Sequence, residues 1–256
     1  IAADIMSLVL LTPPGEWGAD VVIGSTQRFG VSLGYGGPHA AYFATRDQYK
    51  RKVPGRIIGV SRDATGKYAL RMALQVREQH IKRERATSNI CTAQALLASM
   101  AGMYALYHGP AGLKRIAKHI HSAAGLISEE LQKLGYEQKN KDFFDTLKIQ
   151  LPDSVKADKL KKIALDHEVN FRYIDEQTIG INLKKKTLVR DVNLIMKIFA
   201  GAMGKDHREV RDIPEKIYFD QTFRRESPFL TRDLYNRYHS ETEMMRYIKK
   251  LERKDY

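Results

Sequence analysis

The sequence has little cysteine and no long hydrophobic run. Its 256 residues include one cysteine, Cys91, which excludes an internal disulfide and a zinc site built on several cysteines. No apolar stretch approaches the roughly 20 residues that a membrane-spanning helix needs. The longest, residues 93–107, is interrupted by Gln94, Ser99 and Gly102 and fits a buried helix. We therefore predict a protein of a reducing compartment that does not enter a membrane.

Acidic residues are outnumbered, because 43 Lys and Arg stand against 30 Asp and Glu and leave a net charge of +13. Such an excess is typical of nucleic-acid-binding proteins. Here the basic residues are spread along the chain and mixed with acids, and no RNA-binding or zinc-finger signature is present. We interpret the charge as a solvated surface and expect no nucleic-acid partner. Hydrophobic residues make up 43% of the chain, enough for a packed core.

The first third of the chain predicts short strands around turns. Strands are expected at residues 20–23, 40–44, 57–60 and 68–74, with a glycine-rich loop over residues 29–38. The chain begins without an initiator methionine or a targeting pattern, so we expect a piece of a longer protein. The strands then represent the end of a larger sheet, and the apolar runs 9–11 and 21–23 should be left uncovered.

Helices follow. Residues 91–107 are apolar nearly all round and predict a helix buried on most sides. Apolar residues then recur every three or four positions from Leu113 to Leu134, which predicts an amphipathic helix that stops at Gly135.

A smaller α/β unit is predicted next. It consists of a strand at 144–151, a helix at 155–167 capped by Asp153 or Ser154, strands at 170–174 and 178–183, and a helix at 188–202. Residues 204–232 lack periodicity and predict an extended connector. A last helix begins at Ser240 with Glu243 three residues later, the pattern of a capping box.

Four patterns are candidates for chemistry. The glycine loop 34–39 fits either a phosphate cradle or a structural turn, and the turn is favoured because a strand follows it. His119 and His121 do not share a helix face, so we predict solvated histidines rather than metal ligands. Residues 77–80 (Arg-Glu-Gln-His) have no nucleophile nearby and favour a structural role. Residues 87–89 precede the first long helix and fit either a helix cap or an anion site. We predict no metal site and no catalytic residue.

Three stretches together resemble the glycine decarboxylase P-protein family of the glycine cleavage system. They are residues 13–20 (PPGEWGAD), residues 24–41 (GSTQRFG through GYGGPHAA) and residues 77–92 (REQHI through ATSNICT), and Tyr238-His239-Ser240-Glu241-Thr242 is similar too. The resemblance covers essentially the whole chain and its motifs are long.

This resemblance implies an α/β fold of the fold type I pyridoxal-phosphate (PLP) class. Residues 1–110 would be the end of the large domain, with a degenerate cofactor site. Residues 111–203 would be the small C-terminal α/β domain, and residues 204–256 a connector to the second half. The family decarboxylates glycine and passes the aminomethyl group to the lipoyl arm of H-protein, with PLP as the electron sink.

The family consists of two homologous halves, fused or separate, and only the C-terminal half carries the Schiff-base lysine. This chain resembles the later part of the N-terminal half. Gln27 stands where the lysine would be, so PLP is expected in the paired half and not covalently bound here. Asp4 falls near the position of the aspartate that holds the pyridinium nitrogen.

Two hypotheses follow from the resemblance. In the first, the chain is an inactive piece of glycine decarboxylase that forms one wall of the paired half's active site, with Thr87, Ser88 and Asn89 reaching the cofactor phosphate. In the second, it is a docking half that binds its paired half or H-protein without touching the cofactor. The implied location is the cytoplasm of a bacterium or the mitochondrial matrix of a eukaryote, and the complete enzyme would be a homo-oligomer or a heterotetramer.

Overall fold

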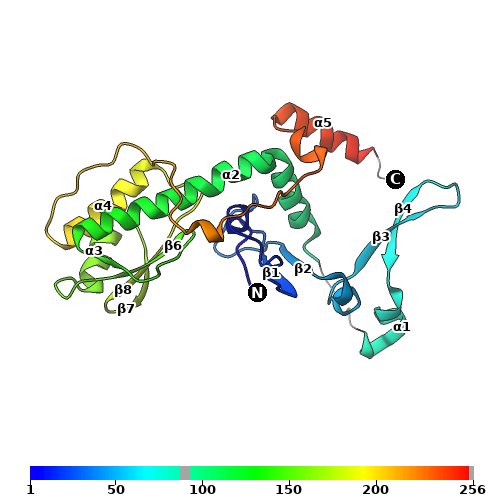
Figure 1. Cartoon of the computed structure of the whole chain (residues 1–256), viewed down its shortest axis with the longest axis horizontal. Coiled ribbons are helices and arrows are strands. Elements are labelled where there is room, and N and C mark those ends of the chain that lie inside the picture. The colour runs from blue at the N-terminus through cyan, green and yellow to red at the C-terminus, as the bar shows by residue number, and fades with distance from the viewer. Residues whose placement is uncertain (87–92, 254–256) are drawn as a thin grey trace. The chain divides into compact units, whose positions relative to one another are not determined.

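The computed structural model describes residues 1–86 and 93–253 (Figure 1). The chain forms two compact units. The first unit contains residues 1–5 and 13–105, and the second contains residues 6–12 and 106–256, of which 254–256 are not described.

The first unit is built from two separate two-stranded sheets. Strands β1 (Val21–Ser25) and β2 (Ala41–Thr45) pair antiparallel, with Ile23 opposite Phe43. Strands β3 (Ile57–Arg62) and β4 (Tyr68–Ala73) form an antiparallel hairpin. A short helix α1 (Gln79–Lys82) follows. All four strands were predicted, because each is an apolar run bounded by turn residues.

The helix α2 (Ala95–Leu134) joins the two predicted helices into one bent element. The bend lies at Gly109, whose φ of 58° is left-handed, directly before Pro110. Proline lacks the N–H that the helix needs and disfavours helical geometry in the residue before it, which explains the bend. The helix ends where expected, because Gly135 adopts a φ of +101° and closes the last turn.

The beginning of α2 corrects one prediction. Residues 91 and 92 lie outside the described part, and the first described turns are not buried on most sides. Leu96 is 74% exposed and Met100 is 40% exposed.

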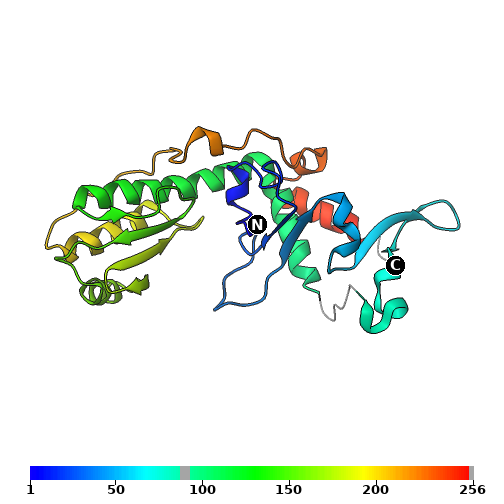
Figure 2. The same ribbon diagram turned by 60° about the horizontal axis from the view of Figure 1, so that its bottom comes forward.

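The second unit contains a four-stranded antiparallel sheet in the order β5-β6-β8-β7. Its strands are β5 (Glu137–Gln138), β6 (Thr146–Gln150), β7 (Arg172–Asp175) and β8 (Thr178–Asn182). Helices α2 and α4 (Val189–Ala202) lie over one face, and α3 (Ala157–Asp166) packs against α4 (Figure 2). The predicted order of strand, helix, two strands and helix is confirmed.

The core of the second unit lies between this sheet face and the helices. Side chains at alternate strand positions, such as Leu147 opposite Ile181 and Ile149 opposite Ile179, are fully or almost fully buried. The predicted cap of α3 is wrong. That helix begins at Ala157, so its N-cap residue is Lys156 and not Asp153 or Ser154. The Lys156 side chain makes no capping hydrogen bond.

The segment after α4 is extended apart from short 3-10 turns, as predicted, but it is anchored along its length. Ser122 on α2 donates a hydrogen bond to the carbonyl of Lys216 and accepts one from its N–H, at 2.9 and 3.0 Å. Further along, Arg225 donates to the carbonyl of Leu10 at 2.7 Å. The segment leads to α5 (Glu241–Glu252), whose predicted capping box of Ser240 and Glu243 is confirmed.

Candidate functional site

The candidate site is the loop between β1 and β2 in the first unit. The loop begins with a turn in which Thr26 donates its N–H to the carbonyl of Ala40 at 2.9 Å. Gly30 follows with a φ of +96°, and a Cβ there would lie 3.2 Å from the ring of Tyr104 on α2. That ring also contacts Phe29, with centroids 5.4 Å apart. The turn is therefore held against the first part of α2.

Gln27 uses its side chain to close this turn. Its amide Nε2 donates to the carbonyl of Val31 at 2.5 Å, and its backbone N–H donates to Ser25 Oγ at 3.0 Å. An amide nitrogen is not nucleophilic, because its lone pair is delocalised into the carbonyl. Gln27 can shape the loop, but it cannot form a covalent bond to an aldehyde.

Asp4 faces a cation of its own chain. Arg28 Nε lies 2.8 Å from Asp4 Oδ2; the Arg28 side chain is half-buried and the Asp4 side chain is exposed. Nearby, burial and then the charge of Asp4 raise the pKa of Tyr42, whose hydroxyl donates to the carbonyl of Ala3 at 2.8 Å. The resemblance put Asp4 only near the position of the aspartate that holds the pyridinium nitrogen, and it did not include Arg28. No local pattern predicts this pair, because it forms only when the first residues of the chain lie beside β1.

The glycine loop is a structural turn. Gly36 and Gly37 both donate their N–H groups to the carbonyl of Leu33, at 2.8 and 3.1 Å. Gly34 and Gly36 have positive φ angles of 48° and 87°, as glycine readily allows. Because the two amides already have acceptors within the loop, they are not aimed at an outside phosphate. The preference for a turn over a phosphate cradle agrees with this geometry.

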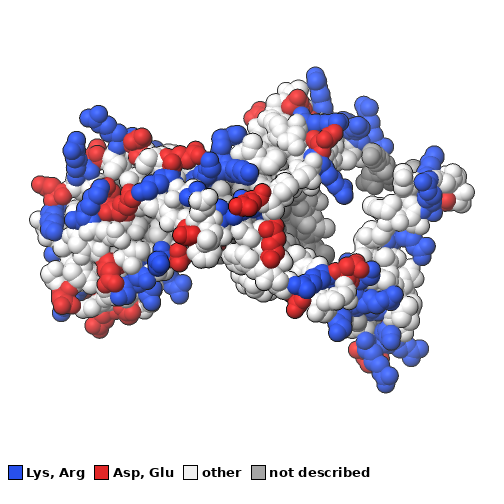
Figure 3. All heavy atoms as spheres, viewed as in Figure 1, with Lys and Arg blue, Asp and Glu red and all other residues white. Residues whose placement is uncertain are grey.

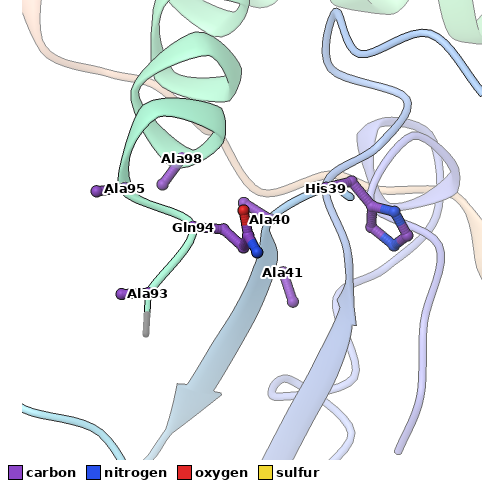
Figure 4. A pocket seen from close by; sticks show the side chains of 7 residues that line it. All are labelled: His39, Ala40, Ala41, Ala93, Gln94, Ala95 and Ala98. Atoms are coloured by element: carbon purple, nitrogen blue, oxygen red, sulfur yellow. The ribbon is translucent and has the colours of Figure 1, made fainter. Parts of the chain in front are cut away.

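A small pocket of about 340 Å³ opens beside the end of this loop (Figure 4). Its lining comes from the start of β2 and the start of α2: His39, Ala40, Ala41, Ala93, Gln94, Ala95 and Ala98. The Gln94 side chain points from the α2 side toward Ala40, whereas the His39 ring points away from the alanines (Figure 4). Gln94 therefore supplies an amide group to a lining whose other residues, apart from His39, are alanines.

The predicted phosphate ligands Thr87, Ser88 and Asn89 lie outside the described residues. Their role stays a prediction.

Two residues of the 77–80 motif are buried at the base of the β3–β4 hairpin. Arg77 and Glu78 are 6% and 3% exposed, and Arg77 Nη1 donates to the carbonyl of Val53. Glu78 lies 3.9 Å from both Arg77 and Arg56. This cluster anchors the hairpin, in agreement with the structural interpretation.

The prediction of two solvated histidines is wrong for His121, whereas His119 is half-buried. His121 is fully buried, its Nδ1 lies 2.8 Å from the carbonyl of Phe144, and its Nε2 accepts the N–H of Tyr218 at 2.8 Å. Since a carbonyl only accepts, Nδ1 carries the proton. Burial lowers the pKa of His121. His119 Nε2 lies 2.7 Å from the carbonyl of Thr187, so both histidines attach other segments to α2.

Residues 1–86 and 93–253 contain no group of three or more His, Cys, Asp or Glu that is able to hold a metal ion. None of the helices in the described part of the chain combines the length and apolar character that a bilayer crossing requires. On the face shown in Figure 3, basic and acidic side chains are intermixed over both units.

Comparison with known proteins identifies the family. The model of the glycine cleavage system P-protein family matches residues 1–199. The chain belongs to this P-protein family. Glycine dehydrogenase (decarboxylating) of Bacteroides thetaiotaomicron is 57% identical over 255 residues, and the mitochondrial glycine dehydrogenase (decarboxylating) 1 of Arabidopsis thaliana is 51% identical over 257. Each match covers all of this chain but only 27% and 24% of the relative, so the chain spans about a quarter of their length.

A solved structure agrees with this assignment. The crystal structure of an inhibitor-bound glycine decarboxylase (P-protein) of the glycine cleavage system has a TM-score of 0.71 and 28% sequence identity to this P-protein chain. The match covers 78% of this chain and 47% of that one. The α/β fold is thus part of the fold type I architecture of PLP enzymes, and the predicted fold class is confirmed.

Proposed function

We propose that this chain is a non-catalytic part of a P-protein glycine decarboxylase. The complete enzyme would decarboxylate glycine with PLP and transfer the aminomethyl group to the lipoyl arm of H-protein. Its partners would be the lysine-bearing half and lipoylated H-protein, in a homo-oligomer or a heterotetramer. It would act in the cytoplasm of a bacterium or in a mitochondrial matrix.

Gln27 is the observation that carries this proposal. It stands at the position that the resemblance assigns to the Schiff-base lysine, and its amide donates to Val31 instead. PLP, when bound to a lysine, supplies the electron sink for decarboxylation. The described residues around Gln27 do not fit a covalently held PLP, because they offer an amide where an amine is required.

Asp4 supports the same conclusion. A carboxylate that stabilises a protonated pyridine nitrogen must point its charge at the ring. Here the guanidinium of Arg28 lies 2.8 Å from that carboxylate and already neutralises it. We therefore place the functional cofactor in the paired half.

A trapping experiment tests the absence of covalent chemistry. The chain is mixed with PLP, reduced with borohydride and weighed by mass spectrometry. We expect no pyridoxyl adduct beyond scattered surface lysines, and no exchange of labelled CO₂ into glycine by the chain alone. A stoichiometric adduct on one specific lysine, or exchange above background, would contradict the proposal.

A second experiment distinguishes the two hypotheses. In one the chain forms a wall of the paired half's active site, and in the other it docks without touching the cofactor. In the complete enzyme, Thr87 and Ser88 are both replaced by Ala. If they reach the cofactor phosphate, losing charge-assisted hydrogen bonds of about 1.5–3 kcal/mol each should raise the cofactor dissociation constant about tenfold or more. If they only cap a helix, stability falls by about 1 kcal/mol per cap and the constant does not change. The second result favours the docking half.

A further inference from the structure

The β3–β4 hairpin exposes an apolar stripe on one face. In its register Val60 lies opposite Leu70, and Arg62 lies opposite Tyr68. Opposite residues of an antiparallel pair share a face, so Ile58, Val60, Tyr68 and Leu70 lie on the same side. Arg62 lies on that side too, at its edge, with its guanidinium carbon 4.8 Å from the centre of the Tyr68 ring. The exposed fractions of Ile58, Val60, Tyr68 and Leu70 are 58%, 72%, 78% and 76%. We call these four residues the hairpin face.

The hairpin is held in shape at both ends. At the tip, Asp63 Oδ1 accepts the N–H groups of Thr65 and Lys67, at 2.8 and 2.9 Å. At the base, the buried Arg77 and Glu78 secure the connection to α1. A two-stranded ribbon is at best marginally stable alone in water and needs packing against another layer. The bonds at the tip and the base therefore fix the shape of the hairpin before another layer buries its apolar face.

We propose that the hairpin face is a docking surface for another segment of the P-protein polypeptide, outside the part that corresponds to residues 1–256. This inference rests on the proposed function. The relative from B. thetaiotaomicron matches this whole chain with only 27% of its length, so nearly three quarters of that polypeptide is available to supply the cover. The covering segment is apolar, to match three aliphatic side chains and a tyrosine.

A second copy of this chain fits the face less well. A stable interface between separate proteins buries roughly 800 Å² per partner, which is more than four side chains supply. A segment of the same polypeptide, held in place by further contacts, does not need that area from the hairpin alone.

Hydroxyl-radical footprinting tests the proposal. The isolated chain is compared with the complete P-protein, with every polypeptide of its assembly present. Labelling of Tyr68 and Leu70 should fall about tenfold in the complete protein, as side chains that are three quarters exposed become buried. Equal labelling in both samples overturns the proposal. Protection that is already present in the isolated chain also overturns the proposal. Protection at every concentration would mean that the chain's own residues cover the face. Protection that rises with concentration would mean that a second copy covers it.

A pair of variants sharpens the test. Val60→Lys places a charge on the hairpin face, whereas the control Ala64→Lys places the same charge at the exposed tip. In the complete protein, Val60→Lys should restore labelling of Tyr68 and Leu70 and lower the melting temperature, and Ala64→Lys should do neither. Identical behaviour of the two variants counts against the proposal. The footprint of the unmodified protein needs no variant, so a failure of Val60→Lys to fold does not weaken the test.

Glycine–CO₂ exchange by the same complete protein separates the two proposals. Exchange with an unprotected hairpin face refutes the docking surface and leaves the proposed function standing. A protected face without exchange refutes the proposed function and leaves the docking of another segment of the polypeptide on the hairpin face supported.

Discussion

The first unit contains two sheets of two strands each, whereas the second contains one sheet of four strands with helices over one face. Large apolar side chains follow this division. On the β3–β4 hairpin, Val60 and Leu70 are about three quarters exposed, while Leu147 and Ile149 on β6 are fully buried. The second unit encloses its own core, and the first presents apolar surface that its own two-stranded sheets do not cover. Independent stability is therefore expected of the second unit.

The sequence predicts that the apolar runs 9–11 and 21–23 are uncovered. Exposed apolar residues are present in the chain, but most of the residues in these two runs are not exposed. Val9 and Val22 are buried, at 5% and 7% exposure, although Ile23 is 46% exposed. Val9 lies in the stretch 6–12, which belongs to the second unit and bonds to the extended segment at Arg224 and Arg225. An exposed apolar stripe lies instead on the hairpin, where Val60 and Leu70 are 72% and 76% exposed.

The largest expected effect comes from truncating one strand leucine in each unit, a buried one in the second unit and an exposed one in the first. Leu147→Ala should lower the free energy of unfolding of the second unit by about 2–5 kcal/mol, because it leaves a cavity in a closed core. Leu70→Ala in the isolated chain should change stability by no more than about 0.5 kcal/mol. Native-state hydrogen exchange, read separately for amides of β8 and β3, measures both. Equal losses would remove the distinction between the units.

A smaller effect is expected from two glycines of the same helix. A Cβ on Gly125 would lie 2.0 Å from the ring of Tyr218, so Gly125→Ala should displace the extended segment and cost about 1–3 kcal/mol. Gly102, in the first unit, has nothing within 4 Å, and Gly102→Ala should stabilise its helix by up to about 1 kcal/mol. Urea unfolding of the two variants gives the comparison. Destabilisation by Gly102→Ala would mean that a Cβ at this position meets a neighbour that is absent from the structure.

The pH dependence of the second unit should follow His121. Burial lowers its pKa in the folded protein, so near and below the usual value of about 6.5 the unfolded chain binds more protons than the folded one. Stability is therefore complete above pH 6.5 and is lost as the pH falls from there toward the lower, folded-state pKa. His108 has a lowered pKa as well and acts in the same direction.

Urea midpoints between pH 8 and 5 measure this effect. His121→Gln should flatten the profile, and the same replacement at His80, which is exposed and lies in the first unit, is the matched control. A profile that keeps its slope in His121→Gln would exclude His121 as its source.

The smallest effect is expected at the Asp4–Arg28 pair in the first unit. Its side chains are 39% and 22% exposed, so solvent screens the attraction and Arg28→Gln should cost no more than about 1 kcal/mol. The loss should shrink further in high salt. Thermal unfolding at two salt concentrations checks this, and a loss that does not depend on salt would indicate packing by Arg28 rather than its charge.

Local features of the fold followed from the sequence alone. The spacing of apolar residues from Leu113 to Leu134, with Gly135 after them, correctly placed the second part of α2 and its end. The pair Ser240 and Glu243 correctly placed the start of α5. The long motifs carried the family assignment. Such signals act over a few neighbouring residues or as whole matched segments, so no knowledge of the packing is needed to detect them.

Only the tertiary structure decided which side chains meet across long separations. His121 was expected to be solvated, but Phe144 and Tyr218 enclose it from segments 23 and 97 residues away. Arg28 reaches Asp4 because the first residues of the chain lie beside β1, where Ala2 bridges Ile23. Burial and ion pairing depend on distances between segments, which no local pattern encodes. For the same reason, the exposure of the hairpin face became visible only when the chain was folded.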